Sequence, residues 1–309
     1  MHRRIWQCAA ALTLLLVAAT GVRAQALNSP KPKDPPREKK LKKEFAESAA
    51  PWAPPNVDAA VPGVSPSTAC SLPDVLAGAA KRVKELVTNL QQFTAAEHLE
   101  HVEIDKRGRP SKPQRRRFDY LVMILQLRHG MLSVEEMRDG GTALDKFPVN
   151  LATIGLPALA LIFHPSYVED FDIRCEGFGT WRGQPAWQVR FAQRADRTSR
   201  MRSYRLRGRS FPIAFKGRAW IAADSFQVVR LETDLLEAIP TIPLTREHME
   251  IEYKPVDFKQ KQLQVWLPES AELYMDFRGH RYHRRHSFSD FQLFSVDVNQ
   301  QIADPKQPQ

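Results

Sequence analysis

Histidines are the residues whose spacing in this sequence most suggests metal chemistry. His280, His283 and His286 recur at intervals of three, and a second pair, His98 and His101, lies beside two glutamates. On a helix this spacing would bring ligands together, but on a strand side chains alternate and His283 points away from the other two. A zinc site needs three or four converging ligands. The strand-like surroundings therefore predict histidines on a basic strand, and we expect neither a metal nor a cofactor.

No short motif marks a catalytic nucleophile. The chain contains no Gly-x-Ser-x-Gly element, and the stretch from Glu247 to Glu250 lacks the second histidine of a zinc-protease helix. No glycine loop of the nucleotide-binding kind is present. We predict no catalytic residue, and an enzyme whose site is assembled from residues far apart in the chain stays open as an alternative.

A run of arginines in the second half of the chain is the most distinctive polar segment. On an extended strand Arg205, Arg207 and Arg209 lie on one face. Arginine forks fit phosphate and carboxylate, so we expect these three to bind anionic lipids or other envelope polyanions. The alternative is a solvated edge strand that its charge protects from aggregation. Nucleic acid is not an expected partner, because only Tyr204 interleaves with the arginines. The whole run is Arg194, Arg197, Arg200, Arg202, Arg205, Arg207 and Arg209.

Residues 1–26 have the anatomy of a secretory signal peptide. Arg3 and Arg4 form a basic start, an apolar run follows, and small residues around Ala24 and Ala26 provide cleavage sites. The alternative is an uncleaved anchor, which needs about 20 apolar residues, and this run is shorter. We therefore expect an exported protein, either periplasmic or secreted.

Export leaves two cysteines in the chain, Cys70 and Cys175. In an oxidising compartment such a pair forms a disulfide, and this one would join the beginning of the folded part to its middle. The alternative is two unpaired, buried thiols.

Composition divides the remainder into three parts. Proline and lysine dominate residues 27–69, which predicts a disordered or extended linker, since such a segment has no apolar surface to bury. Residues 70–302 form a single folded domain, and residues 303–309 form a loose tail.

One helix and a long series of strands are the expected elements of this domain. Ser71 caps a helix with Pro73 in its first turn, and apolar residues from Leu76 to Leu90 recur at helical spacing. Residues 147–164 predict one or two short buried helices. Strands are predicted at 94–105, 117–127, 177–181, 185–193, 203–208, 212–216, 246–253, 262–267 with Pro268 ending it, 271–278, 280–287 and 291–297.

Residues 217–235 predict a hairpin at the centre of the sheet. In its second strand Val229 and Leu231 alternate with Arg230 and Glu232, which describes one dry and one wet face. Because twist accumulates over many strands, such a sheet must curl or close. The predicted fold class is α+β and mostly antiparallel β. We expect a curled, unclosed, barrel-like sheet packed on a long amphipathic helix, with a short helical insertion.

This layout resembles the LolA/LolB superfamily of periplasmic lipoprotein carriers. The resemblance is one of architecture, extends over about residues 70–300 and involves no short diagnostic motif. The blocks Trp181–Phe191 and Gly217–Ile221 also look like a set of exported bacterial proteins. The chain departs from the carriers in its length, its basic linker and its lack of the lipid-attachment cysteine of the LolB kind. The resemblance implies an unclosed barrel wrapped around helices that holds acyl chains.

The leading functional hypothesis is a non-catalytic exported binding protein. It would hold a lipid, or the acyl chain of a lipoprotein, in a cavity of the curved sheet lined by Val229, Leu231, Ile251 and Tyr253. The alternative is an envelope interaction module that binds anionic surfaces through the arginine strand, in agreement with the formal net charge of +10. The sequence assigns no oligomeric state.

Overall fold

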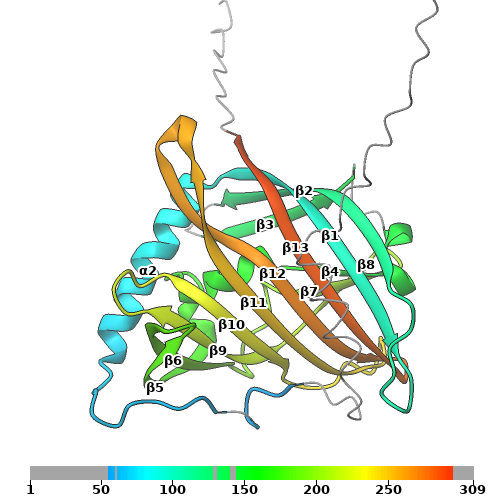
Figure 1. Cartoon of the computed structure of the whole chain (residues 1–309), viewed down its shortest axis with the longest axis horizontal. Helices are drawn as coiled ribbons and strands as arrows, with labels where there is room; N and C mark the ends of the chain where they lie inside the picture. The colour runs from blue at the N-terminus through cyan, green and yellow to red at the C-terminus, as the bar shows by residue number, and fades with distance from the viewer. Residues whose placement is uncertain (1–54, 60, 128–130, 140–143, 295–309) are drawn as a thin grey trace, which may run out of the picture. The chain divides into compact units, whose positions relative to one another are not determined.

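The computed structural model describes residues 55–59, 61–127, 131–139 and 144–294 (Figure 1). All of them belong to one compact unit, Ser48–Gln309. The predicted signal peptide, the first part of the predicted linker and the predicted tail lie outside the described residues.

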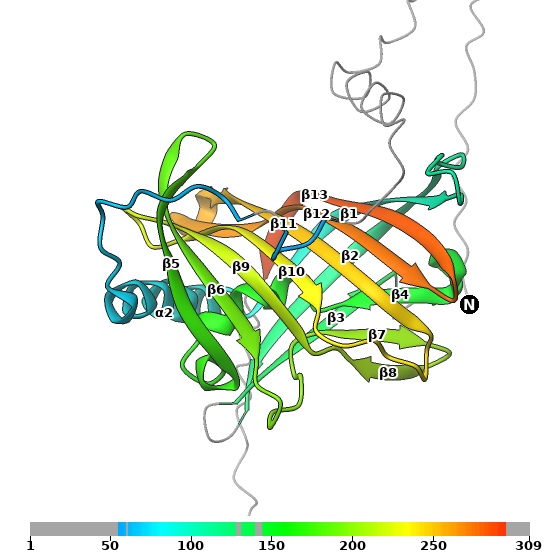
Figure 2. The ribbon, with the colours of Figure 1, turned by 90° about the horizontal axis from the view of Figure 1, so that it is seen from below.

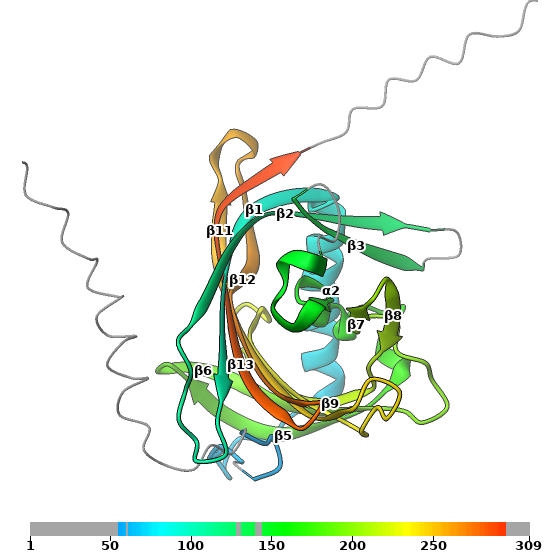
Figure 3. The ribbon, with the colours of Figure 1, turned by 90° about the vertical axis from the view of Figure 1, so that its right-hand side faces the viewer.

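A large antiparallel sheet forms the body of this unit. Its two edges are β3 and β5, which do not pair with each other, so the predicted curled and unclosed sheet is confirmed (Figure 3). In spatial order its strands are β3 (Leu132–Arg138), β2 (Gln114–Gln126), β1 (Gln92–Ile104), β13 (His280–Phe294), β12 (Leu263–Phe277), β11 (Leu244–Phe258), β10 (Val228–Leu235), β9 (Phe215–Ala222), β6 (Gln184–Gln193) and β5 (Phe171–Trp181).

Helical segments and a small second sheet fill the concave face. Helix α2 (Leu72–Asn89) buries the residues Val75, Ala79, Val83 and Val87, which recur every four positions. The 3₁₀ helix η4 (Pro157–Phe163) is buried along its whole length and shares the concave face with α2. The small sheet has the order β4 (Leu151–Ile154), β7 (Ser203–Leu206) and β8 (Arg209–Pro212), and the shorter 3₁₀ helices are η2 (Leu144–Lys146), η3 (Pro148–Asn150), η5 (Val168–Asp170) and η6 (Lys259–Lys261).

The helices differ from the prediction in length and number. Helix α2 begins beside Ser71 as predicted, but it has an ordinary 18 residues, so a long helix is not confirmed. The insertion at 147–164 contains strand β4 as well as 3₁₀ helices. Within the described residues, no helix combines the length and apolar character needed to cross a membrane.

Several strands are longer than predicted. Pro268 does not end a strand but lies inside β12, opposite Tyr253, where the register with β11 shifts. At such an irregularity the missing N–H of proline is tolerated. The last two predicted strands are one strand, β13, and strand β3 was not predicted.

Ordered contacts begin ahead of Cys70, within residues that the sequence assigned to the linker. The backbone N–H of Val57 donates to Asp234, Asp58 pairs with Arg190 and Lys216, and Ser65 bridges to Phe178 of β5. Figure 2 shows this segment in blue, running over β9 and β10. The predicted disulfide between Cys70 and Cys175 is present, with the two Cα atoms 6.4 Å apart, and it fixes the segment to β5.

Candidate ligand-binding pocket

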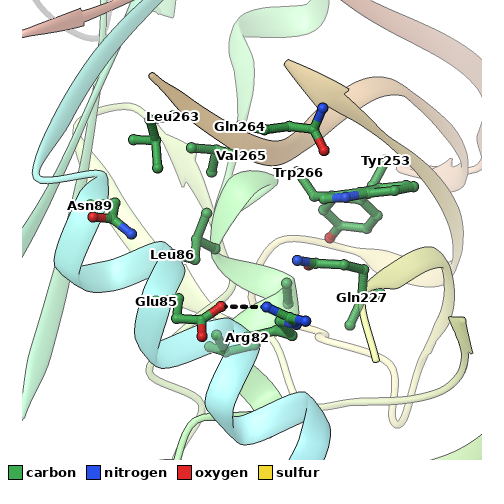
Figure 4. A pocket seen from close by; sticks show the side chains of 13 residues that line it. Arg82, Glu85, Leu86, Asn89, Gln227, Tyr253, Leu263, Gln264, Val265 and Trp266 are labelled. Carbon is green, nitrogen blue, oxygen red and sulfur yellow. Dashed lines mark hydrogen bonds and ion pairs between the residues drawn. The ribbon is translucent and has the colours of Figure 1, made fainter. Parts of the chain in front are cut away.

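A pocket of about 130 Å³ lies between α2 and the hairpin formed by β11 and β12 (Figure 4). It lies at the end of the sheet where β10 and β12 begin. Its lining is half apolar and half polar. The lining residues are Arg82, Val83, Glu85, Leu86, Asn89, Ala160, Gln227, Val228, Tyr253, Leu263, Gln264, Val265 and Trp266.

Helix α2 supplies the charged wall of the pocket. Arg82 donates from Nη1 to Glu85 at 2.8 Å and from Nε to the carbonyl of Ser225 at 2.7 Å. Both side chains of the ion pair stay accessible, with exposed fractions of 36% for Arg82 and 42% for Glu85. A pair this exposed is worth little and can exchange partners. Arg82 can therefore turn toward a ligand without a large loss of stability.

A glycine in α2 permits the close approach that forms this wall. A Cβ placed on Gly78 would lie 2.3 Å from the ring of Phe226, in the turn between β9 and β10. Glycine inside a helix costs about 1 kcal/mol relative to alanine. That cost is offset here because the ring lies directly on the helix and brings Ser225 within reach of Arg82.

The β11–β12 hairpin supplies the facing wall. Tyr253 is 7% exposed, and burial raises the pKa of its phenol well above the usual range, so it stays neutral. Val265 is buried beside it, while Leu263 and Trp266 are half-buried at the mouth. The facing wall is thus uncharged and mostly apolar.

Only one of the four predicted apolar ligand-binding residues lines this pocket. Tyr253 does, whereas Leu231 and Ile251 are 0% exposed and packed in the core. Val229 lies on the opposite face of the sheet with Trp220, because a register shift between Val228 and Arg230 reverses the alternation. Leu231 and Ile251 therefore belong to the main hydrophobic core and Val229 to the cluster on the opposite face.

The predicted anion-binding arginines lie at the other end of the fold and do not share one strand face. Arg205 is on β7, Arg209 begins β8, and Arg207 lies in the turn between them with φ 50°. With Gly208 at φ 77°, this turn has two residues in the left-handed region. The three side chains therefore belong to a hairpin tip, with Arg207 and Arg209 exposed.

The histidines diverge as the strand geometry predicts. His286 hydrogen-bonds Glu97 at 2.7 Å, whereas His283 faces the other side of β13 and contacts Glu272 at 2.9 Å. His280 is exposed and pairs with Glu103. In the described part of the chain, no three His, Cys, Asp or Glu side chains are grouped so that they could hold a metal.

Sequence reasoning missed the polar residues of the pocket. Arg82 sits among Lys81, Lys84 and Glu85, so its position in sequence predicts a solvated helix face. Gln227 precedes β10 and Trp266 lies on β12, and no local pattern reveals that these segments approach α2. The one available signal was Gly78, which interrupts an otherwise regular helix.

The sequence matches no protein-family model and no curated protein. The fold is similar to a DUF1329 family protein from Desulfovibrio piger, with 10% identity and a TM-score of 0.42 over 75% of this chain and 95% of that one. It is similar to a putative outer membrane lipoprotein-sorting protein domain from Vibrio parahaemolyticus, with 8% identity and a TM-score of 0.39 over 72% and 94%.

It is also similar to a LolA superfamily protein from Nitrosomonas europaea, with 11% identity and a TM-score of 0.37 over 74% of this chain and 96% of that one. The feature of the fold that the strand pairing establishes for this chain is an unclosed antiparallel sheet curled around helical segments (Figure 3).

Proposed function

We propose that this chain is an exported, non-catalytic binding protein for an amphiphile. Its acyl portion enters the pocket between α2 and the β11–β12 hairpin, and its acidic head group meets Arg82 at the mouth. The observation that supports this most directly is that the pocket combines the charged pair Arg82 and Glu85 with apolar side chains from both of its walls. An amphiphile is the ligand class that has both halves.

The apolar half of the site suits a hydrocarbon. Val83, Leu86, Val228, Leu263 and Val265 present only carbon to the pocket. Burying apolar surface there yields about 25 cal/mol for each Å² removed from water. Tyr253 and Trp266 add broad ring surfaces on the hairpin side.

The head group is assigned to Arg82 because of its hydrogen-bonding geometry. Its Nε and Nη1 groups are used by Ser225 and Glu85, while Nη2 has no partner among the described residues. A guanidinium binds carboxylate or phosphate through two parallel N–H donors. Displacement of Glu85 would complete such a fork.

The volume of the pocket limits how much of a ligand fits. A cavity of about 150 Å³ holds a molecule the size of benzene. A pocket of about 130 Å³ therefore accepts only the first few carbons of an acyl chain. A longer acyl chain would fit only if the β11–β12 hairpin moved away from α2. The two walls belong to elements that lie far apart in the sequence, so no short connection ties one wall to the other.

The first test is native mass spectrometry of the full-length protein purified from cells that export it, combined with titration of a fluorescent fatty acid. We expect co-purified lipid, and we expect Leu86→Trp, which fills the pocket, to weaken fatty-acid binding about tenfold or more. The control is Ala77→Trp. Nine residues away on the same helix, this position faces the opposite, solvent side, so the variant should bind normally. Equal binding by both variants would refute the assignment.

A second pair of variants tests the head group. Arg82→Gln should weaken a fatty acid more than the matching fatty alcohol, because only the acid presents a carboxylate. Lys84→Gln removes the same charge from the exposed side of α2 and should affect neither ligand. If both variants weaken the acid equally, general electrostatic attraction accounts for the preference and Arg82 does not bind the head group.

A further inference from the structure

Four connections between strands gather at the end of the sheet opposite the pocket. They are the β1–β2 loop, the β7–β8 turn, the β10–β11 loop and the β12–β13 turn. In Figure 2 the β7–β8 hairpin, the end of β12 and the beginning of β13 lie on the same, right-hand side. No short sequence motif contains them, because the first and the last of them are separated by more than half of the chain.

Specific contacts hold these connections together. Ile104 at the end of β1 pairs with Arg281, and Glu103 bonds His280 at 2.7 Å, so the β1–β2 loop adjoins the β12–β13 turn. The N–H of Arg278 donates to the carbonyl of Pro243 at 2.7 Å, which adds the β10–β11 loop.

The β7–β8 hairpin joins the same end through its inward side chains. The hydroxyl of Tyr204 lies 4.0 Å from the sulfur of Met275, and Arg202 pairs with Glu247 at 2.6 Å. Strand β7 therefore lies over the last residues of β12 and the first residues of β11. The β7–β8 turn lies at the same end of the fold (Figure 2).

Exposed cations concentrate on these connections. None of them forms an ion pair with a carboxylate among the described residues, while Glu103 and Asp105, the acidic residues of this end of β1, already pair with His280 and Arg109. Asp276 and Glu237 add two negative charges nearby, so the excess is positive. The exposed residues, which we call the cationic end, are Lys106, Arg107, Arg207, Arg209, Arg246 and Arg278.

We propose that the cationic end docks the protein on a membrane surface that carries anionic lipid. Its exposed charges lie on or directly beside separate connections, and no enclosed cavity is needed to reach them. Such an arrangement meets several phosphates of a headgroup layer at once, whereas a single free phosphate could contact only a few of the six. Each cation held near an anionic surface contributes to attraction, and the contributions add within the screening length.

Docking by this end leaves the amphiphile pocket directed away from the bilayer. The inference is therefore independent of the pocket's ligand. Loss of vesicle binding with normal fatty-acid binding, or the reverse, identifies which of the two proposals fails.

Co-sedimentation of the full chain with vesicles tests the proposal, comparing neutral phosphatidylcholine with phosphatidylcholine that contains phosphatidylglycerol. The variant combines Arg207→Asn, Arg209→Gln and Arg278→Asn. Asparagine is chosen at 207 and 278 because both have positive φ, of 50° and 56°, which asparagine tolerates. We expect binding to the anionic vesicles to weaken about 100-fold at low salt.

The matched control removes three exposed lysines elsewhere, with Lys81→Gln, Lys84→Gln and Lys261→Gln. It has the same net charge as the variant and should bind anionic vesicles almost as well as the parent chain. An equal loss in the two triple variants would overturn the proposal, because net charge alone would then explain binding. Displacement of the protein from vesicles by millimolar inorganic phosphate at constant ionic strength would also overturn it, since the site would then prefer a free anion.

Discussion

The concave and convex faces of the sheet each carry a buried ionic cluster, and the two clusters differ in the charge of the histidine that each contains. On the concave face Glu97 binds both Arg138 and His286, and Glu136 lies beside Arg138. On the convex face His248 lies between Asp234 and Glu250, and Arg230 pairs with Glu250. Both clusters thus consist of an arginine, a histidine and carboxylates, but they differ in the number of carboxylates that contact the histidine.

The number of carboxylates around each imidazole explains the difference. His286 donates from Nδ1 to Glu97, while its Nε2 has no partner among the described residues, so a second ring proton would be buried without an acceptor. Burial lowers the pKa of His286, and its bond to Glu97 does not restore it. The ring on the concave face is neutral.

His248 has an acceptor at each ring nitrogen. Nδ1 lies 2.7 Å from Asp234, and Nε2 lies 3.3 Å from Glu250. Burial disfavours the charged ring, but the two carboxylates outweigh it and raise the pKa of His248 to about 9. The ring on the convex face is an imidazolium at neutral pH. A buried histidine is therefore charged or neutral according to its acceptors, and burial alone does not decide.

The largest expected effect comes from removing the central arginine of the concave cluster. Arg138→Met should lower the free energy of unfolding by about 3–5 kcal/mol, because Glu97 and Glu136 would stay buried without a cation. Arg138 and Glu97 have side chains that are 0% exposed, so water cannot replace the lost partner. Urea denaturation at pH 7 measures the loss.

Arg230→Met is the matched change on the convex face. Its partner Glu250 keeps 25% of its side-chain surface exposed, so water can solvate it, and we expect a loss of only about 1 kcal/mol. Equal losses for the two variants would show that the concave cluster is as well hydrated as the convex one, and the comparison would fail.

Acid should act mainly on the concave cluster. Burial, followed by the nearby charge of Arg284, lowers the pKa of His101 to about 3, and burial lowers that of His286 as well. Both rings are neutral when folded and gain protons more readily when unfolded. Their contribution to stability is complete above the ordinary value of 6.5 and is lost as the pH falls toward the folded pKa.

The variant His101→Asn checks this acid dependence, because an asparagine oxygen can still accept from Nε of Arg284. We expect the fall in stability between pH 6.5 and pH 4 to shrink by about 1–2 kcal/mol, measured by urea denaturation at each pH. His98→Asn, an exposed change on the same strand, is the control. If stability falls by the same amount between pH 6.5 and pH 4 in the parent chain, in His101→Asn and in His98→Asn, the prediction is contradicted.

The sequence predicts the features of this molecule that depend on local patterns. The start of α2 follows from Pro73 in its first turn; Ser71 occupies the N-cap position, but its side chain makes no capping hydrogen bond. The alternation in 246–253 places Met249 and Ile251 in the core. The disulfide follows from the two cysteines that lie outside the predicted signal peptide, Cys70 and Cys175. In each case residues close in sequence, or the only available partners, determine the structure.

Features that depend on strands far apart were not predictable. Strand β3 escaped prediction because Glu136 and Arg138 are polar, yet both are buried where Glu97 of β1 neutralises Arg138. The register shift at Val228 reversed the expected orientation of Val229. The pocket and the cationic end are likewise formed by residues far apart in the sequence. Of these residues, the sequence pattern indicated Tyr253, Arg207 and Arg209, and their ligand-binding roles stay predictions.

The smallest expected effect is an alkaline one on the convex cluster. Because the folded pKa of His248 is raised from 6.5 to about 9, the charged ring stabilises the fold fully below pH 6.5, and this contribution is lost as the pH rises through 9. His248→Gln should abolish most of this loss of stability at alkaline pH. We expect the difference to be about 1 kcal/mol between pH 6.5 and pH 9.5, after allowance for the solvent-accessible Glu250. Urea denaturation of the parent and the variant across that range measures it, and NMR titration of the ring locates the pKa directly. A ring that titrates near 6.5 would place His248 in the same class as an ordinary exposed histidine, and the contrast between the faces would then rest on His286 and His101 alone.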